Sequence, residues 1–357
     1  ENCEKLTIRS SCPPPLGPPE WRRKEGGAGQ ARAVGRAGWP GQPHAGRACG
    51  ESRVSAHGLT VAASAAALAS HPDPAEARPQ AKAGKGRRRH MITTEHDGGV
   101  AVIRFSNPPR GYLTAVTSAE LDSAVAEALA DDNVRVLILT GADAEAKEPV
   151  FIRHYAIPEI EAMADAVESG AITGTGPRGE VPVYRLIDRL LAAEKPVIAA
   201  INGTCMGGGF ETALACTIRV AAAGDYPIGL PETRLGILPG AGGLQFLARL
   251  MGLSQATAFV LEGLAVPPAE ALRLGLVHQV ADGPVVEAAV AYARRLEARP
   301  AAALAAVQRM HRALAGGEGL ANGLETAARE FLETLKPGSG ARALLARFHD
   351  VGENILA

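Results

Sequence analysis

The sequence predicts an α/β fold followed by a helical C-terminal region, and three observations support this prediction. Short apolar runs rich in β-branched residues, typical of buried strands, occur at 100–105, 134–140 and 197–201. A segment with one apolar face, typical of a helix, lies between the first two runs. A strand, a helix and a strand at this spacing indicate a parallel pair with a crossover connection. Beyond residue 283 nearly every segment has a helical pattern.

The strands and helices before the central stretch follow from the same patterns. We expect Thr117 to cap a helix and Glu120, three residues later, to complete a capping box. A glycine-rich segment at 169–180 is either a lid over a bound ligand or a surface loop. The segments expected up to residue 193 are a strand beginning at 91, a strand at 100–105, a helix from 117 to about 130, a strand at 134–140, a polar loop at 141–150, and helices at 157–166 and 183–193.

The central stretch, residues 195–243, carries the strongest chemical signal. A buried strand at 197–201 ends at Asn202, and Gly207, Gly208 and Gly209 precede an alanine-rich helix. A strand that passes through glycines into a helix exposes free backbone N–H groups at the positive end of the helix dipole. Such a turn suits an oxygen atom that becomes negative during a reaction.

Two acidic residues flank this glycine turn. Glu211 lies just inside the helix, and Glu232 follows Pro231 after a second apolar run at 218–223. Taken singly, Glu211 is explained by the helix dipole, and Glu232 by an ion pair with Arg234. Further glycines at 236–243 indicate an irregular backbone beyond Glu232. Together the two acids predict a carboxyl pair that can share one proton.

In this order, these features resemble the enoyl-CoA hydratase/isomerase (crotonase) family. The matching motifs are the glycine triplet with its acid two residues on, the Pro-Glu at 231–232 and the Pro-Gly-Ala-Gly-Gly at 239–243. The resemblance extends more loosely from Met91 to the C-terminus. It implies a ββα superhelix, or spiral, with the active-site core at 91–280 and a helical oligomerisation region at 281–357. It also implies a trimer or a dimer of trimers.

The resemblance assigns roles to particular residues. Glu211 would act on the attacking water, and Glu232 would protonate Cα of a 2-enoyl thioester. The backbone N–H groups of Tyr155 and Gly208 would form the oxyanion hole. The chain departs from the family before Tyr155, because Arg153 and His154 replace small residues and Ala156 replaces an aspartate. The residues expected to bind substrate or CoA are Arg110, His154, Gly207, Gly209, Pro231 and Gly240, and Lys195 is a further candidate for the CoA phosphates.

The reaction predicted is syn addition of water across the 2,3 double bond of an enoyl-CoA, which makes the protein a hydro-lyase. The alternatives are an isomerase or another acyl-CoA enzyme of the family, and a non-catalytic acyl-CoA-binding or scaffold member. His154 is either a third acid–base group or part of the pocket wall. We expect no metal and no cofactor apart from CoA, the carrier group of the substrate.

Composition separates the first 90 residues from the rest. Residues 1–90 are rich in Pro, Gly, Ala and Arg and contain 15 Lys and Arg against 7 Asp and Glu, whereas the remainder contains 22 against 31. We expect residues 1–90 to be disordered and to be an upstream extension foreign to the natural protein, which would start at Met91. The acidic remainder disfavours nucleic acid as a partner.

Cysteine usage and hydropathy predict a cytoplasmic protein. Cys205 and Cys216 lie in apolar or small-residue contexts, which predicts buried reduced thiols and no disulfide. No apolar run reaches the length of a membrane span, so we expect no membrane partner. The helices expected after the central stretch lie at 254–262, 268–274, 284–298, 300–315, 320–335 and 341–348, with a short extended piece at 277–280.

Overall fold

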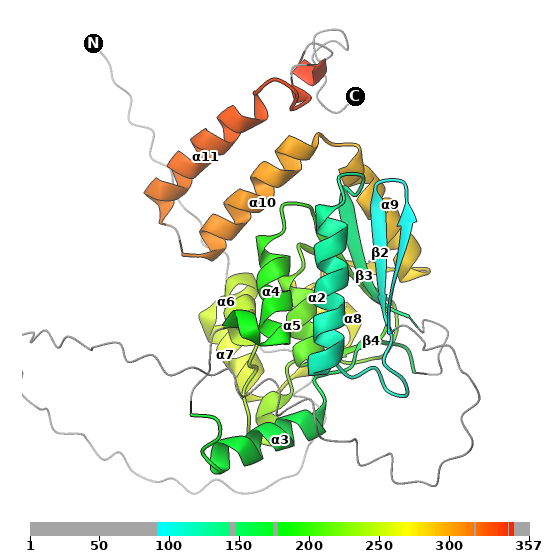
Figure 1. Cartoon of the computed structure of the whole chain (residues 1–357), viewed down its shortest axis with the longest axis vertical. Helices are drawn as coiled ribbons and strands as arrows, with labels where there is room; N and C mark the ends of the chain where they lie inside the picture. The colour runs from blue at the N-terminus through cyan, green and yellow to red at the C-terminus, as the bar shows by residue number, and fades with distance from the viewer. Residues whose placement is uncertain (1–90, 143–147, 174–177, 318, 342, 346–357) are drawn as a thin grey trace, which may run out of the picture. The chain divides into compact units, whose positions relative to one another are not determined.

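A computed structural model describes residues 91–142, 148–173, 178–317, 319–341 and 343–345 (Figure 1). The expectations for residues 1–90 lie outside the described residues, and so does much of the helix expected at 341–348. Part of the polar loop at 141–150 and part of the glycine-rich segment at 169–180 are likewise not described.

The larger sheet has six strands in the order β1-β2-β3-β5-β7-β10. β1 and β2 pair antiparallel, and the other four pairs are parallel. The α/β class and the crossover between β2 and β3 are therefore confirmed. The strands are β1 (Ile92–Asp97), β2 (Val100–Phe105), β3 (Val136–Gly141), β5 (Val197–Ile201), β7 (Ile218–Ala222) and β10 (Gln279–Ala281).

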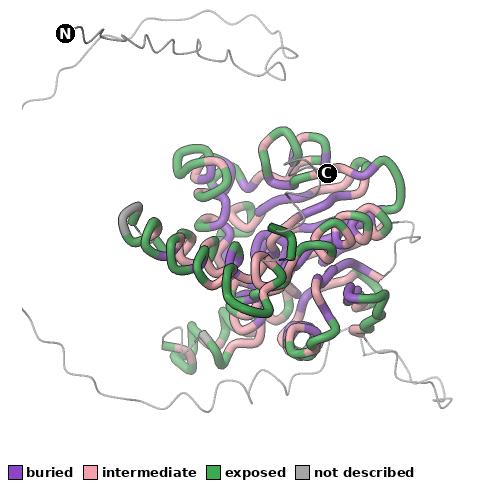
Figure 2. Tube along the Cα trace, turned by 90° about the horizontal axis from the view of Figure 1, so that it is seen from above, coloured by how far each residue is buried: buried purple, intermediate pink, exposed green. Residues whose placement is uncertain are grey.

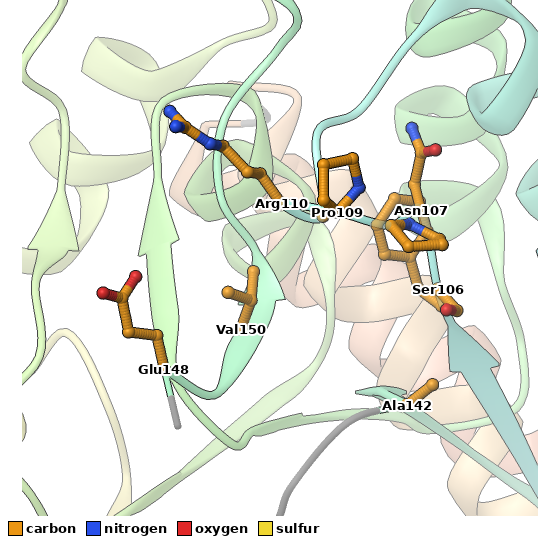
Figure 3. Close-up of a pocket in the computed structure, with 10 residues that line it drawn as sticks. Ser106, Asn107, Pro109, Arg110, Ala142, Glu148 and Val150 are labelled. Carbon is orange, nitrogen blue, oxygen red and sulfur yellow. The ribbon is translucent and has the colours of Figure 1, made fainter. Parts of the chain in front are cut away.

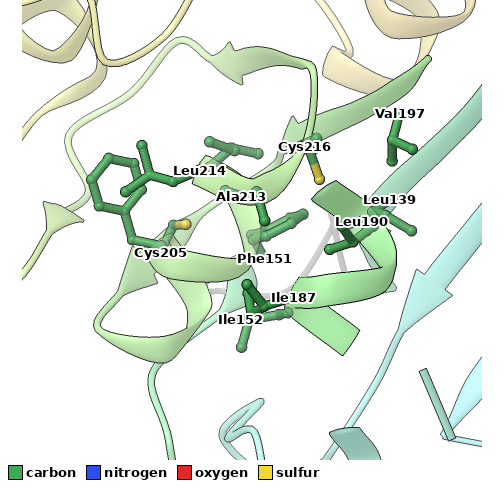
Figure 4. Close-up of a cluster of buried hydrophobic side chains, with 14 of the residues drawn as sticks. Leu139, Phe151, Ile152, Ile187, Leu190, Val197, Cys205, Ala213, Leu214 and Cys216 are labelled. Carbon is green, nitrogen blue, oxygen red and sulfur yellow. The ribbon is translucent and has the colours of Figure 1, made fainter. Parts of the chain in front are cut away.

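Helices cover both faces of the larger sheet, which explains why its central strands β3 and β5 are buried along their whole length and almost entirely apolar, whereas the edge strand β1 is polar and exposed. Along β5, Val197, Ala199 and Ile201 belong to the main core, which also contains residues of α2, α4 and α5. Ile198 and Ala200 point the other way and join a second cluster with α9. Figure 4 shows side chains from β3, β4, β5, α4 and α5 gathered in the main core.

Most helices agree with the expected segments, but α6 was not predicted, because its first residue lies in the glycine-rich stretch at 236–243. Two short 3-10 helices, η3 (Arg178–Glu180) and η4 (Glu232–Leu235), are also present. The α-helices are α2 (Ala115–Ala130), α3 (Ile157–Glu168), α4 (Pro182–Ala192), α5 (Gly208–Ala215), α6 (Gly243–Met251), α7 (Leu253–Leu261), α8 (Pro268–Arg273), α9 (Val285–Glu297), α10 (Ala301–Ala315) and α11 (Leu320–Thr334).

The start of α2 corrects the predicted capping box. Thr114, not Thr117, is the N-cap, and its hydroxyl accepts a hydrogen bond from the Thr117 amide at 3.1 Å. The Thr117 hydroxyl in turn accepts from the Thr114 amide at 2.8 Å. A second threonine thus does the work that the sequence rule assigns to a glutamate, and Glu120 takes no part in the box.

A smaller sheet of four short strands runs in the order β4-β6-β8-β9. β4 follows β3 along the chain, β6 follows β5 and β8 follows β7, and each of these pairs leads into helical structure. The fold therefore repeats a unit of two strands and a helix. The sequence patterns missed these strands because two or three residues are too few for a period: β4 (Val150–Ile152), β6 (Thr204–Met206), β8 (Ile228–Gly229) and β9 (Ala265–Val266).

The last helices lie beyond the sheets. α10 and α11 pack side by side and antiparallel (Figure 1). They leave several large apolar side chains exposed. In Figure 2 the exposed residues, in green, lie mostly on the outer turns of the molecule, and the buried residues, in purple, lie mostly toward its interior. Among the described residues, no helix combines the length and the hydropathy that a bilayer crossing requires. The exposed apolar residues on these two helices include Val307, Leu314, Leu324, Phe331 and Leu332.

A buried ion cluster joins α2 to α4. Asp122 is 3% exposed, and its two carboxylate oxygens accept hydrogen bonds from the Nε atoms of Arg185 at 2.6 Å and Arg189 at 2.5 Å. Burial acts to raise the pKa of Asp122, but the hydrogen bonds and charges of the two arginines outweigh it, so the pKa is lowered. The cluster therefore stabilises the fold while Asp122 is ionised.

Replacing Asp122 should show this stabilisation directly. We expect Asp122→Asn to lower the free energy of unfolding at neutral pH by about 3 kcal/mol, the low end of the cost of breaking a buried pair, because the arginines remain partly solvated. Because the folded-state pKa is depressed, the difference from wild type should narrow as the pH falls below about 4. Urea unfolding at several pH values measures both effects. Glu95→Gln, which breaks an exposed pair with Arg104, is the control and should cost less than about 1 kcal/mol. Equal losses in the two variants would contradict the expectation.

Candidate active site

Three turns meet at the ends of the smaller sheet. β6 pairs in parallel with β4 on one side and with β8 on the other. The turn after β4 contains His154 and Tyr155, the turn after β6 contains Gly207 and Gly208, and Glu232 follows β8. Because neighbouring parallel strands end at the same edge of a sheet, residues far apart in the sequence become neighbours here. This edge is the candidate active site.

Steric limits explain the glycines that open α5. Gly207 has φ +49°, and a Cβ there would lie 2.9 Å from Oε1 of Glu232. A Cβ on Gly209 would lie 2.1 Å from the carbonyl oxygen of Ile152, so only glycine allows α5 to approach β4 this closely. Gly208 is the first residue of α5, where the amide has no partner within the helix.

The amide nitrogen of Tyr155 lies close to Gly208. Leu113 forms a parallel bridge with Tyr155, in which the Leu113 amide donates to His154 O at 2.9 Å and the Ala156 amide donates to Leu113 O at 2.7 Å. The N–H of Tyr155 itself therefore points away from Leu113. A Cβ added at Gly208 would lie 3.7 Å from the Tyr155 nitrogen. Neither amide donates a hydrogen bond to another described residue.

Glu211 is fixed by backbone amides. Its side chain comes from the first turn of α5 and is 2% exposed. Oε1 accepts hydrogen bonds from the amides of Ala241 at 2.7 Å and Gly243 at 2.8 Å. Burial raises the pKa of this carboxyl, and the hydrogen bonds from the glycine-rich backbone act in the opposite direction. A carboxylate held by amide donors keeps one oriented oxygen and can still exchange a proton.

Glu232 has a different environment. Its Oε1 lies beside Gly207, and within the described part of the chain its buried Oε2 has no hydrogen-bond partner. Burial raises the pKa of Glu232 to about 7, and the charge of Glu211 adds to the increase. The structure therefore brings Glu211 close enough for its charge to affect the ionisation of Glu232. Two carboxyls with unequal environments can divide the work of a base and an acid.

Three other predicted residues, His154, Pro231 and Gly240, lie in the segments that surround the two glutamates. His154 is half-buried, its Nδ1 is 2.8 Å from the Tyr155 carbonyl oxygen, and its ring centroid is 4.8 Å from that of Tyr112. Pro231 is the N-cap of η4, directly before Glu232. Gly240 precedes the Ala241 amide that binds Glu211.

Lys195 does not lie at this edge. It precedes β5, whereas the glycine turn follows the opposite end of that strand, and its Nζ donates to the carbonyl oxygen of Asp131 at 2.7 Å. Lys195 therefore lies at the other edge of the sheet, away from the candidate active site. The physical reason is strand direction: residues before and after a parallel strand lie at opposite edges of the sheet.

Arg110 lies on a neighbouring cavity of about 60 Å³ (Figure 3). The cavity also contacts Asn107, which follows β2, and Glu148 and Val150, which lie at the start of β4. The guanidinium of Arg110 is exposed and donates to the Tyr112 hydroxyl at 3.5 Å. Arg110 thus connects through Tyr112 to His154 in the turn after β4, and contacts neither glutamate directly.

Sequence reasoning missed two features of the site. It treated the glycines at 236–243 only as irregular backbone, although the amides of Ala241 and Gly243 are the partners of Glu211. It also missed Glu159 and Tyr184, which lie beside the Tyr155 phenol. No local pattern marks these contacts, because they join segments that are distant in sequence. The described residues contain no cluster of three or more His, Cys, Asp or Glu that could bind a metal.

Comparison with known proteins identifies the family. Residues 160–343, just over half of the chain, match the family model described as enoyl-CoA hydratase/isomerase. The chain belongs to the enoyl-CoA hydratase/isomerase family. It is 36% identical over 192 residues to a short-chain-enoyl-CoA hydratase of Clostridium acetobutylicum, which covers 54% of this chain and 69% of the relative. The resemblance drawn from the glycine triplet, the Pro-Glu and the Pro-Gly-Ala-Gly-Gly is thus confirmed.

Solved structures of the family share the fold. An enoyl-CoA hydratase subunit from Geobacillus kaustophilus superposes with a TM-score of 0.63 at 28% identity, covering 73% of this chain and 96% of that one. An enoyl-CoA hydratase from Bacillus anthracis gives a TM-score of 0.62 at 26% identity, with 73% and 97% covered. The predicted crotonase-like ββα superhelix is confirmed.

Some relatives are much longer than the matching region. The peroxisomal bifunctional enzyme of Danio rerio is 35% identical over 201 residues, which is 56% of this chain. That match spans 25% of the zebrafish enzyme, and the match to the human enzyme spans 26%. The chain therefore corresponds to about a quarter of the length of these bifunctional relatives.

The unequal environments of the two glutamates can be measured without a substrate. Carbon NMR of glutamate-labelled protein, with the Glu232 signal assigned from Glu232→Gln, should show Glu232 titrating with a pKa of about 7. Glu211→Gln removes the smaller, charge-dependent part, so the pKa of Glu232 should fall but remain above its ordinary 4.5. The control Glu262→Gln, an exposed acid at the end of α7, should leave it unchanged. A wild-type Glu232 that titrates near 4.5 would contradict the burial argument.

Proposed function

We propose that the protein is an enoyl-CoA hydratase that adds water across the 2,3 double bond of a 2-enoyl-CoA thioester. One observation carries this proposal: two neighbouring backbone amides that have no partners among the described residues lie beside two carboxyls with unequal environments. The amides can stabilise an enolate oxygen, and the carboxyls can transfer a proton from water. The names of the hydratase relatives support the same reaction.

In this mechanism the thioester oxygen accepts hydrogen bonds from the amides of Tyr155 and Gly208. Negative charge grows on that oxygen as water attacks Cβ, and each donor of this kind is worth about 2.7–4 kcal/mol in the transition state. The N-terminal end of α5 adds the positive end of its dipole. The stabilisation depends on the backbone, so the unusual side chains before and at Tyr155 are compatible with it.

The carboxyl pair moves the protons. Glu211 accepts one proton from water as the water oxygen bonds to Cβ, and Glu232 delivers its own proton to Cα. One proton therefore stays within the pair, and the sum of the two steps adds one molecule of water to the double bond. The fixed Oε1 of Glu211 leaves its second oxygen for water, and the raised pKa of Glu232 suits a proton donor near neutral pH.

Two carboxyls also distinguish hydration from the alternatives. Moving a double bond along an acyl chain requires one group that removes and returns a proton, whereas adding water also requires a group that orients the water. The second buried acid, Glu211, with its own amide clamp, therefore favours the hydratase over an isomerase. The neighbouring amides favour catalysis over a purely binding or scaffold role.

The carrier group, the assembly and the cellular location complete the proposal. We propose that the CoA portion lies toward Arg110 and His154, where an exposed guanidinium can meet a phosphate. The exposed apolar side chains of α10 and α11 support a homo-oligomer, proposed as a trimer or a dimer of trimers. We propose a cytoplasmic location and no metal or further cofactor.

Removal of either carboxyl should slow hydration strongly. With crotonyl-CoA as substrate, we expect Glu211→Gln and Glu232→Gln each to lower kcat by roughly 10²–10⁴-fold, with smaller changes in KM, because each loses one proton-transfer role. Loss of enoyl-thioester absorbance measures the rate. The control Glu262→Gln should retain wild-type activity. Wild-type rates in the double glutamate variant would rule out the proposed mechanism, and binding without turnover in the wild type would favour a different reaction.

The rate should depend on pH through Glu232. Hydration needs the protonated form of this residue, whose pKa is raised to about 7, so kcat/KM should fall as the pH rises through this value. Above it the decrease should approach about tenfold per pH unit. A pH–rate profile of the wild type and of Glu232→Gln tests this, because the residual activity of the variant should lack the descending limb. A flat wild-type profile from pH about 6 to about 9 would sink the assignment of Glu232 as the acid.

A further inference from the structure

The side chain of Tyr155 starts beside the two neighbouring amides. A Cβ placed on Gly208 would lie 3.5 Å from the Tyr155 Cβ, and the half-buried ring packs against the main core together with Tyr184 of α4. Burial raises the pKa of the Tyr155 phenol, and the charge and hydrogen bonding of Glu159 raise it further. The phenol is therefore a neutral group with a fixed neighbour.

Glu159 ties this ring to the start of α2. It lies in the first turn of α3, and its Oε2 accepts a hydrogen bond from the amide of Ala115 at 2.9 Å. Ala115 is the first residue of α2, so the carboxylate is held at the positive end of that helix. The Tyr155 side chain is thus braced by two helices and is not a freely moving loop residue.

Tyr184 lies between Tyr155 and the loop that contains Gly240; we call the side chains of Tyr155 and Tyr184 the tyrosine wall. Like Tyr155, Tyr184 packs against the main core, and its phenol contributes to the raised pKa of Tyr155. A Cβ on Gly240 would lie 3.8 Å from the Tyr184 hydroxyl oxygen. Gly240 precedes Ala241, whose amide binds Glu211. The two tyrosines therefore connect the region of the amide pair with the loop that holds Glu211.

An acyl chain bound for hydration would have to pass the side chains of Tyr155 and Tyr184. In the proposed mechanism the carbonyl lies on the amides of Tyr155 and Gly208 and Cβ faces Glu211. Because the amides of Ala241 and Gly243 hold Glu211, the carbons beyond Cβ would then lie nearest the loop at 240–243. A long apolar tail would have to displace the two rings, which pack against the main core. Glu159 also repels an acyl group that ends in a second carboxylate.

We propose that Tyr155 and Tyr184, braced by Glu159, close the acyl end of the site and restrict the enzyme to short, uncharged 2-enoyl thioesters. The inference rests on the proposed hydratase function and adds its substrate class. Tyr155 then has two separate roles, since its backbone amide binds the thioester oxygen and its ring limits chain length. Tyr184 and Glu159 are specificity-determining and positioning residues.

The test compares chain lengths on the full-length protein. Values of kcat/KM are measured with crotonyl-CoA, hexenoyl-CoA and decenoyl-CoA for the wild type, Tyr155→Ala and the matched control Tyr155→Phe. We expect the wild type to prefer crotonyl-CoA to decenoyl-CoA by about 100-fold or more, since each extra methylene in a closed pocket costs roughly tenfold or more. The ratio of decenoyl to crotonyl activity should rise at least about tenfold in Tyr155→Ala and change less than about threefold in Tyr155→Phe.

The ratio separates this proposal from the proposed function. No hydration of any of the three thioesters would refute the hydratase assignment itself. Equal wild-type kcat/KM for crotonyl-CoA and decenoyl-CoA would be consistent with the hydratase function and would overturn the proposed limit on chain length. Tyr184→Ala is the second variant if Tyr155→Ala does not fold, and it too should raise the ratio. An unchanged ratio in a folded alanine variant would overturn the proposal.

Discussion

The parallel pairing of β4, β6 and β8 is the constraint on which the candidate active site depends. These strands contain only two or three residues each, yet their pairing places three turns from distant parts of the chain at one edge. Gly209 allows α5 to approach β4, because any side chain there would collide with a backbone carbonyl. The site thus depends first on backbone positions, because the pairing of the strands brings together the turns that contain its two amides.

The two glutamates show how the same side chain acquires different properties. Glu211 is almost fully buried but has two amide donors on one oxygen. Glu232 has a buried oxygen without a partner among the described residues and a pKa raised to about 7. Burial disfavours both anions, and donors offset the effect in one of them. Their inequality follows from the loop at 240–243, which reaches Glu211 and not Glu232.

In the turn after β4, the backbone and the side chains have different roles. Its amides and carbonyls bond to the segment around Leu113, so the direction of the Tyr155 N–H is set by a bridge that does not depend on side-chain identity. Large residues can therefore occupy positions where small ones are expected, provided that their side chains find space elsewhere. The Tyr155 ring finds it against Tyr184 and Glu159.

The sequence by itself determined the α/β class, most helices, most strands of the larger sheet and the motifs that identify the family, because periodicity and glycine spacing are local properties. It misplaced the cap of α2, where a threonine replaced the expected glutamate. It could not find the smaller sheet, the amides that bind Glu211, the neighbours of Tyr155 or the edge of the sheet at which Lys195 lies. Only the tertiary structure decided these points, since each depends on strand direction or on contacts between segments far apart in the chain.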